Sequence, residues 1–179
     1  TLWFYNGWQY SSKERKKPFI EYVDNTTVKA THSKMGSYYL YFTQPDDLLF
    51  TENETNQEKL TGRPNNNIFV KDAFHDAVIN GKNVAALREI KKGTKCSPVY
   101  KRNVAAKQST VIYLRLCNTA LNTAFETGFE TIFEQRRNEA DEFYQYILPK
   151  NKPDELNNIQ RQAFAGLLWS KQFYHYDVD

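Results

Sequence analysis

Several features that define common protein classes are scarce in this sequence. Two cysteines among 179 residues are too few for the disulfide framework of a small secreted domain. No apolar run approaches the roughly 20 residues that a membrane-spanning helix needs, so we expect no membrane partner. The three histidines, His32, His75 and His175, lie far apart, and none has a second ligand three or four residues away. The sequence therefore predicts no metal site.

The charge balance argues against a nucleic-acid partner. The net charge is +3, and the basic residues are spread among acids. Two short basic clusters, Lys13–Lys17 and Lys91–Lys95, are interpreted as solvated loop charges, since a nucleic-acid site requires a concentrated basic face. The few glycines form no phosphate-binding pattern, so we expect no cofactor.

The cysteines and the chain ends bear on the compartment. The sequence leaves open whether Cys96 and Cys117 pair, but free thiols are the default in a reducing compartment. The first residues have neither an initiator methionine nor the basic, apolar and small-residue order of a signal peptide. We expect a cytoplasmic protein of which this chain is a piece, with both ends cut.

The first two thirds of the chain has the pattern of antiparallel strands. Short segments rich in β-branched and aromatic residues alternate with turn signals, as in a meander. The expected strands are Phe19–Val23, Thr27–Thr31, Ser37–Thr43, Leu48–Phe50, Ile68–Val70 and the pair Ser97–Ala106 and Ser109–Cys117. Leu2–Tyr10 is expected to form a strand, a turn and a second strand. In the last segment the aliphatic residues Ile112, Leu114 and Leu116 are predicted to mark the core face.

One long polar stretch interrupts these strands. Glu52–Asn67 has no clear periodicity, and loops of this length in compact domains are usually functional or disordered. Lys71–Asn80, ahead of Gly81, is expected to be either a short helix or a loop.

After Asn118 the period becomes helical. Apolar residues recur at three and four residues over Phe125–Ile147, which predicts an amphipathic helix of about seven turns. Asp154 is expected to cap a second helix that runs from Glu155 to about Tyr176. Residues 163–169 are apolar on every face, so we expect them to be buried in a larger body. The predicted fold class is α+β, with a β-sandwich over residues 1–120 and a helical hairpin over residues 121–179 that begins an all-α domain.

Carboxylates and aromatic residues are the remaining candidates for chemistry. Hydrolysis of a glycosidic bond needs two carboxyl groups on opposite sides of that bond. The candidates by type are Glu52, Glu54, Asp72 and Asp76, and the alternative is that they are solvated loop acids. Aromatic residues make up 15% of the chain, and sugar rings stack on such side chains. Near the C-terminus Trp169, Gln172, Tyr174 and Tyr176 offer stacking faces beside polar groups, unless they serve the fold itself.

Five blocks of sequence, in the same order, resemble glycoside hydrolase family 63-like proteins, a group of large glucosidases. The longest block, QRQAFAGLLWSKQFYHYDV, is at Gln160–Val178. The others are LWFYNGW at Leu2–Trp8, LLFTENETN at Leu48–Asn56, VKDAFHD at Val70–Asp76 and RRNEADEFY at Arg136–Tyr144.

This resemblance implies a β-sandwich that leads into an (α/α)6 barrel with an inverting active site at the barrel mouth. The general acid of the family is an Asp directly after a Trp, and none of Trp3, Trp8 and Trp169 is followed by Asp. We therefore expect the catalytic pair to lie outside this piece, and the piece alone to be inactive. By resemblance, the substrate-binding candidates are Trp169, Lys171, Gln172 and Tyr174 at the barrel mouth, with Glu52 and Glu54 on a rim formed by the polar stretch.

The sequence thus predicts an N-terminal fragment of an α-glucosidase that hydrolyses a small glucoside or oligosaccharide without a cofactor. Its expected partners are the carbohydrate substrate and the rest of the barrel, and its exposed apolar helix faces predict self-association. The alternative is a stand-alone β-sandwich module that binds a carbohydrate or a protein.

Overall fold

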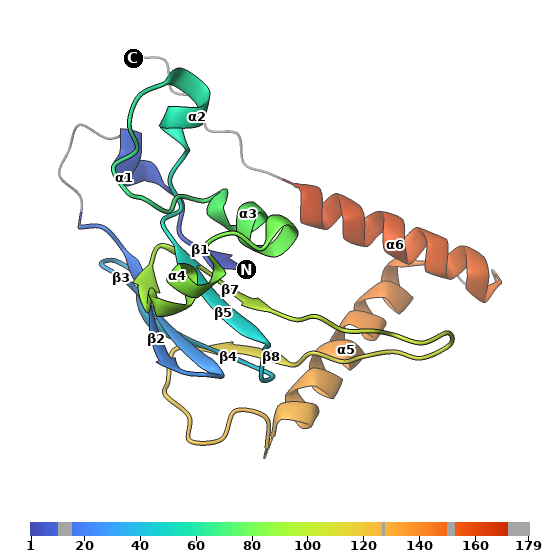
Figure 1. The fold of residues 1–179 in the computed structure, drawn as a ribbon. Coiled ribbons are helices and arrows are strands. Elements are labelled where there is room, and N and C mark those ends of the chain that lie inside the picture. Colours follow the sequence, from blue (N-terminus) through green and yellow to red (C-terminus); the bar gives the residue numbers. More distant parts are fainter. Residues whose placement is uncertain (11–15, 127, 150–152, 172–179) are drawn as a thin grey trace. The chain divides into compact units, whose positions relative to one another are not determined.

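The computed structural model describes residues 1–10, 16–126, 128–149 and 153–171 (Figure 1). The chain divides into two compact units, Thr1–Ala124 and Phe125–Asp179. The first contains antiparallel sheets with short helices and the second contains two long helices, so the predicted α+β class is confirmed.

Within the described residues of the first unit the strands form two antiparallel sheets. The five-stranded sheet has the order β6-β2-β3-β4-β8, with β2 at Phe19–Asp24, β3 at Thr27–His32, β4 at Gly36–Phe42, β6 at Lys92–Gly93 and β8 at Leu114–Cys117. The three-stranded sheet has the order β1-β7-β5, with β1 at Leu2–Trp3, β7 at Lys95–Val99 and β5 at Asp47–Thr51.

The predicted meander is confirmed by β2, β3 and β4. The turn between β2 and β3 is held by Asp24, whose Oδ1 accepts hydrogen bonds from the Thr26 amide at 2.7 Å and the Thr26 hydroxyl at 2.9 Å. An Asp side chain that bonds the backbone two residues on is a common turn device. The turn before β4 places Gly36 at a φ of 79°, a conformation that favours glycine.

One hydrophobic core joins the two sheets. Ile20, Val28 and Phe42 from the five-stranded sheet pack with Phe50 and Cys96 from the three-stranded sheet, and all five are fully buried. Burial raises the pKa of the Cys96 thiol to about 12, because a thiolate is poorly solvated there. Both cysteines are free, and the Cys96 thiol is inert at neutral pH.

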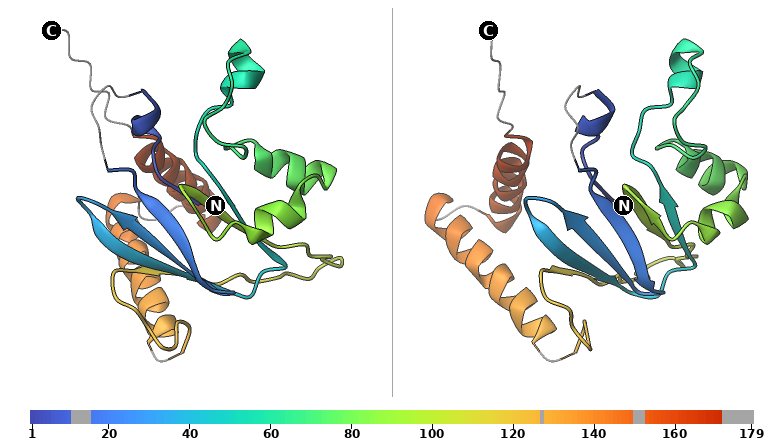
Figure 2. Two further views of the ribbon diagram at one scale, coloured as in Figure 1. Left: turned by 60° about the vertical axis from the view of Figure 1, so that its left-hand side comes forward. Right: turned by 90° about the vertical axis from the view of Figure 1, so that its left-hand side faces the viewer.

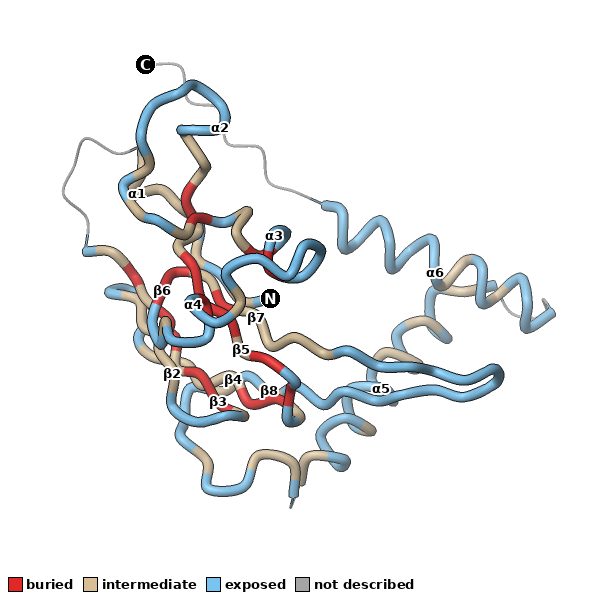
Figure 3. The backbone as a smooth tube through the Cα atoms, viewed as in Figure 1, coloured by how far each residue is buried: buried red, intermediate tan, exposed pale blue. Residues whose placement is uncertain are grey.

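The other face of the three-stranded sheet is covered by two helices, α3 at Ala73–Asn80 and α4 at Val84–Glu89. Leu49, next to Phe50 on β5, points to this side and packs with Phe74 and Leu87. Successive residues of a strand face opposite sides, which is why β5 contributes to both cores. Figure 2 shows the five-stranded sheet, then the three-stranded sheet, and then the layer formed by α3 and α4. Figure 3 shows that buried residues line β5.

The helix α3 confirms the expected short helix that Gly81 ends, and Gly81 adopts a φ of 64° at its C-cap. The helix α4 was not predicted. The second strand expected within Leu2–Tyr10 is wrong, because Gly7–Tyr10 forms the short helix α1. Its first turn closes by a hydrogen bond from the Gln9 amide to the Asn6 carbonyl at 3.1 Å, so Asn6-Gly7 starts a helical turn and not a hairpin.

Three expectations about later strands are wrong. Ile68–Val70 forms no strand, and the Ile68 side chain is 89% exposed. The segments around residues 97–117 do not pair with each other, because β7 pairs with β1 and β5 while β8 pairs with β4. Ile112, Leu114 and Leu116 are exposed rather than buried, since β8 is an end strand whose aliphatic face is not covered within its own unit.

The second unit contains α5 at Phe129–Ile147 and α6 at Asp154–Ser170. The Arg161 guanidinium joins the helices by an ion pair with Asp141 at 2.5 Å and by lying over the Tyr144 ring at 4.7 Å. Pro153 occupies the N-cap position, so the prediction that Asp154 caps this helix is wrong by one residue. In the described part of the chain no helix is long and apolar enough to cross a membrane.

The apolar run of α6 is exposed in this piece, in agreement with the expected exposure of apolar helix faces, and its burial in a larger body stays a prediction. Trp169 is 91% exposed, and Leu167 and Leu168 are 67% and 60% exposed. A single hairpin can cover only the side of each helix that faces the other helix. Lys171 is already in an extended conformation, so α6 ends earlier than predicted, and residues 172–176 of the predicted helix lie outside the described residues.

Candidate functional site: a buried carboxylate cluster

The polar stretch after β5 is ordered by backbone hydrogen bonds. The Glu52 amide donates to the Phe69 carbonyl at 3.1 Å, and the Lys71 amide donates to the Glu54 carbonyl at 3.2 Å. Residues 52–54 and 69–71 therefore run side by side, although they do not form a regular sheet. This pairing carries Glu54 into the interior, where only 4% of the residue is exposed.

Three donors from distant parts of the sequence converge on the Glu54 carboxylate. Its Oε1 accepts hydrogen bonds from the Trp8 indole N–H at 2.9 Å and from the Lys17 ammonium at 3.1 Å. Its Oε2 accepts a hydrogen bond from the Asn67 side-chain amide at 3.0 Å. A buried carboxylate requires such partners, because without them its desolvation would be very costly.

Lys17 connects this carboxylate to a second one. Its ammonium lies 2.9 Å from Glu52 Oε2, and the Thr94 hydroxyl donates to the same oxygen at 2.6 Å. The side chain of Glu52 is 22% exposed, whereas that of Glu54 is 5% exposed. Glu52 is thus the acid in this cluster that solvent and ligands can reach.

The electrostatics of the cluster favour an ionised Glu54 carboxylate. Burial would raise the pKa of Glu54, but hydrogen bonds from Trp8, Asn67 and Lys17, together with the charge of Lys17, outweigh burial and hold this pKa below its ordinary value. Burial would lower the pKa of Lys17, but its bonds and attraction to Glu52 and Glu54 raise it. Two negative charges around one positive charge leave the cluster with a net charge of about −1.

The N-terminal segment is tied to the same place. The Gln9 side chain exchanges two hydrogen bonds with the backbone of Thr55, at 2.9 and 3.2 Å. The Asn53 side-chain amide donates to the Phe4 carbonyl at 2.8 Å. The Asn53 backbone N–H donates to the Thr94 hydroxyl at 2.7 Å. Every residue from Glu52 to Thr55 is therefore bonded to a segment far away in the sequence.

A third carboxylate, that of Asp72, anchors the end of the polar stretch. The Asn56 side-chain amide donates to both Asp72 oxygens, at 3.1 and 3.2 Å. The side-chain Oδ1 of Asn56 caps helix α2, at Gln57–Thr61, by accepting the Lys59 backbone amide at 3.0 Å. An Asn at the N-cap satisfies amides that the first helical turn leaves unpaired.

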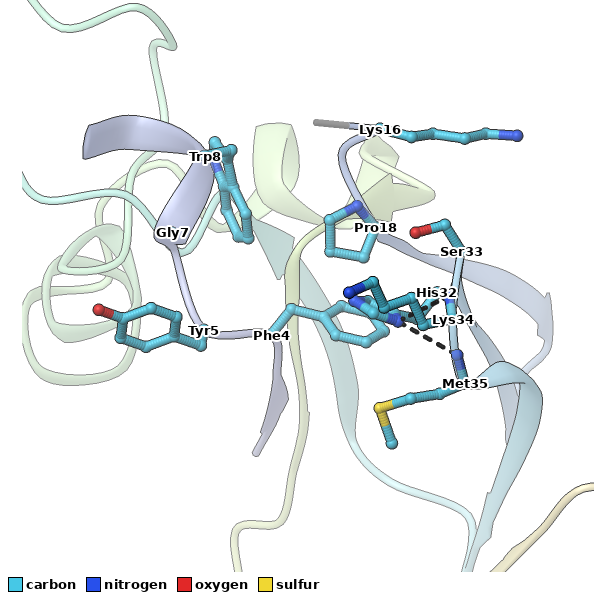
Figure 4. Close-up of a pocket in the computed structure, with 10 residues that line it drawn as sticks. All are labelled: Phe4, Tyr5, Gly7, Trp8, Lys16, Pro18, His32, Ser33, Lys34 and Met35. Atoms are coloured by element: carbon cyan, nitrogen blue, oxygen red, sulfur yellow. Dashed lines mark hydrogen bonds between the residues drawn. The ribbon is translucent and has the colours of Figure 1, made fainter. Parts of the chain in front are cut away.

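An open cavity of about 550 Å³ lies beside the cluster (Figure 4). Trp8 belongs to both, because its indole N–H bonds Glu54 while its ring lines the cavity. The remaining lining residues are Phe4, Tyr5, Gly7, Lys16, Pro18, His32, Ser33, Lys34 and Met35. Figure 4 shows the Phe4 ring against His32, with Pro18 above and Met35 below.

The structure brings two of the predicted binding residues together. Glu52 and Glu54 share Lys17, whereas Asp72 bonds Asn56 and Lys59 and Asp76 is exposed on α3. Trp169 and Lys171, in the second unit, are both exposed. Gln172 and Tyr174 lie outside the described residues, as does Tyr176.

Sequence reasoning missed the partners that define the cluster. The interpretation of Lys13–Lys17 as solvated loop charges is wrong for Lys17, which pairs with two carboxylates. Asn67 and Thr94 carried no motif signal, and nothing in the block Leu2–Trp8 indicated that Trp8 bonds Glu54. The available signal was the acidic and amide-rich TENETN at residues 51–56, because such a run after a buried strand needs donors from elsewhere.

This arrangement suits positioning better than acid catalysis. Glu54 is ionised and surrounded by donors, so it does not hold the proton that a general acid delivers. In the described part of the chain no group of three or more His, Cys, Asp and Glu side chains is placed to hold a metal ion. What the cluster can do is fix the orientation of Trp8 and present Glu52 at the surface.

We expect the stability of the protein to fall with acidification in a window that starts near the ordinary Glu pKa of about 4.3. The pKa of the Glu54 carboxyl group is lower in the folded state than in the unfolded state. As the pH falls, the unfolded state therefore takes up a proton on this group before the folded state does. The stabilisation is therefore complete above that pH and is lost as pH falls through the folded-state pKa. Urea unfolding at several pH values measures this loss.

The Glu54→Gln variant is expected to show a shallower loss of stability than the wild type over this window. Glu58→Gln, which removes an exposed acid on α2, is the matched control and should keep the wild-type slope. An unchanged slope in Glu54→Gln would contradict the assignment.

The fold and the cluster together define an α+β protein in which two antiparallel sheets share a core and an ionised carboxylate cluster flanks an aromatic cavity. The chain is similar to "Uncharacterized protein YMR196W" of Saccharomyces cerevisiae, with 34% identity over 214 residues, covering 99% of this chain. The chain spans about a fifth of that protein, since the alignment covers 20% of its length. No protein-family model matches the chain, and no solved structure is significantly similar to it.

Proposed function

We propose that this chain is the N-terminal part of an inverting glycoside hydrolase that cleaves α-glucosidic bonds in a small glucoside or oligosaccharide. The observation that carries the proposal is where the family-like blocks lie in the fold. Leu2–Trp8 and Leu48–Asn56 are far apart in sequence, yet both contribute side chains to the cluster, and Val70–Asp76 lies beside it through the hydrogen bond from the Lys71 amide to the Glu54 backbone carbonyl. The meeting of these sequence-distant blocks at one place in the fold supports the proposal.

Two further observations support a larger architecture. The similar yeast protein is about five times as long as the aligned part, which leaves room for a full barrel. The exposed apolar residues of α5 and α6 suit a hairpin that packs against further helices of an (α/α)6 barrel. In this proposal the two-sheet unit is the β-sandwich that precedes the barrel, and the catalytic acid and base lie in the rest of the protein.

The described residues would act in binding and positioning. Glu54 fixes Trp8, and the half-buried Glu52 is the acid that can accept hydrogen bonds from sugar hydroxyls at the rim of the site. Trp169 and Lys171 would contribute at the barrel mouth, where an exposed indole offers a stacking face.

The test uses the intact protein with α-linked glucose disaccharides, and product configuration is followed by NMR. We expect release of glucose with inversion at the anomeric carbon, so that β-glucose appears first. The 179-residue chain alone should release none. If the intact protein binds these sugars without cleaving them, the alternative of a binding module replaces the hydrolase.

The rim assignment is tested in the same assay with Glu52→Gln. We expect KM to rise about tenfold, the equivalent of one charge-assisted hydrogen bond of about 1.4 kcal/mol, with little change in kcat. Glu58→Gln is the control for loss of an exposed acid nearby. A wild-type KM in Glu52→Gln would remove this residue from the binding site.

A further inference from the structure

The cavity beside Trp8 has aromatic walls that are held in fixed positions. Phe4 is bonded through its backbone amide to the Thr94 carbonyl at 2.9 Å, and its ring stacks on His32 with centroids 5.9 Å apart. The Trp8 ring is fixed by Glu54 on its N–H edge and lies under the Lys17 ammonium, 5.5 Å from its centroid. Walls that need no rearrangement reduce the entropy lost on binding.

Tyr5 is the open platform of this cavity. Its side chain is 84% exposed, and an added Cβ at Gly7 would lie 3.2 Å from the Tyr5 ring. Glycine at this position thus lets the ring lie close against the backbone of the neighbouring turn. A large exposed aromatic ring at a cavity mouth offers a stacking face for a ligand ring.

The polar groups that line the cavity are mainly donors. Nδ1 of His32 accepts the backbone amides of Lys34 at 3.2 Å and Met35 at 3.3 Å, so the ring proton is on Nε2 (Figure 4). Lys16 and Lys34 add two ammonium groups, and the Ser33 hydroxyl can also donate. None of the described residues that line the cavity is acidic.

From these features we propose that the cavity binds an anionic carbohydrate, a sugar that carries a phosphate or a carboxylate group. The sugar ring stacks on the exposed Tyr5 ring, and its negative group is attracted by the ammonium groups of Lys16 and Lys34, which also line the cavity. A volume of about 550 Å³ is within the range of roughly 300–1,000 Å³ that is usual for small-molecule sites. A nucleotide base fits less well, because Phe4 already stacks on His32 and leaves one open platform instead of a two-sided slot.

This site is distinct from the proposed catalytic function and does not depend on it. Its walls come from the first unit alone, whereas hydrolysis requires carboxylates from the rest of the protein. Binding can be measured without turnover, so failure of the hydrolase assay leaves this proposal standing, and the reverse also holds.

The experiment measures binding to the intact protein at low salt by isothermal titration calorimetry. The four ligands are glucose 6-phosphate, glucuronic acid, neutral maltose and adenosine monophosphate. We expect one or both charged sugars to bind more tightly than maltose, and which of them binds separates a phosphate from a carboxylate ligand. Lys34→Glu should weaken charged-sugar binding at least about fivefold, and Tyr5→Ala should weaken it to a similar extent.

Matched controls are available at exposed positions that do not line the cavity. Lys107→Glu makes the same charge change on the loop between β7 and β8, and Tyr146→Ala removes a 91% exposed tyrosine on α5. Wild-type affinity in both controls, with loss in both cavity variants, supports the site. The proposal is overturned if neither charged sugar binds, if maltose or the nucleotide binds more tightly, or if the cavity variants behave like their controls.

Discussion

Replacing Glu54 by alanine is expected to lower the free energy of unfolding by about 4 kcal/mol, because removing one partner of a buried ion pair leaves the rest unpaired. In this variant the Trp8 indole N–H and the Asn67 amide lose their acceptor, and Lys17 loses one of its two carboxylate partners. Lys17 keeps its ion pair with Glu52, so part of the cluster remains and limits the loss of stability. Urea unfolding at neutral pH measures the change.

Two variants make this prediction specific to the cluster. Glu58→Ala removes an exposed acid four residues further along, and we expect a change within about 0.5 kcal/mol. In the double variant Lys17→Met, Glu54→Ala the penalties should not add, because the two residues contact each other. If Glu54→Ala is as mild as Glu58→Ala, the cluster contributes little to folding.

Substitution of Gly93 by alanine is expected to destabilise the protein by about 3 kcal/mol. A Cβ at this position would lie 2.4 Å from the Thr51 carbonyl oxygen and 3.0 Å from its carbon, and both belong to the backbone of β5. Strand backbone cannot move aside as a flexible side chain can, so the extra methyl group forces the two sheets apart. Differential scanning calorimetry would record the lower melting temperature.

Gly166 supplies the matched control for this prediction. It lies inside α6 with nothing within 4 Å of an added Cβ, so Gly166→Ala should stabilise the helix by about 0.5–1 kcal/mol. The same chemical change is thus expected to have opposite signs at two positions. A Gly93→Ala protein as stable as the wild type would mean that the sheets do not approach so closely at Thr51.

The elements that were predictable from sequence are those with a strong local signal. The β2–β4 meander is local, because each strand is followed directly by its partner, and the period of three and four residues identified α5. The pairing of β7 and β8 depended on distant partners instead. Val99 pairs with Asp47, and Leu116 pairs with Leu40, and no local pattern contains that information.

The candidate site shows the same division. The TENETN stretch identified Glu52 and Glu54 as candidate acids by type, but the sequence could not tell that Glu54 is buried and Glu52 is only half-buried. That difference arises from Trp8 and Lys17, which lie 46 and 37 residues away from Glu54. Contacts over such separations follow from the tertiary fold, and residue type alone does not indicate them.

The chain passes from one sheet to the other at Thr94, between β6 and β7, and this connection has a consequence for the order of folding. The meander needs only short loops to close, whereas the Trp8–Glu54 hydrogen bond closes a loop of 46 residues. Because long loops close at a higher entropic cost, we expect the N-terminal segment to join the structure late, after Thr94 has brought the sheets together. Trp8 then becomes fixed in its final environment only when both sheets have assembled, and its fluorescence would report the last step of folding.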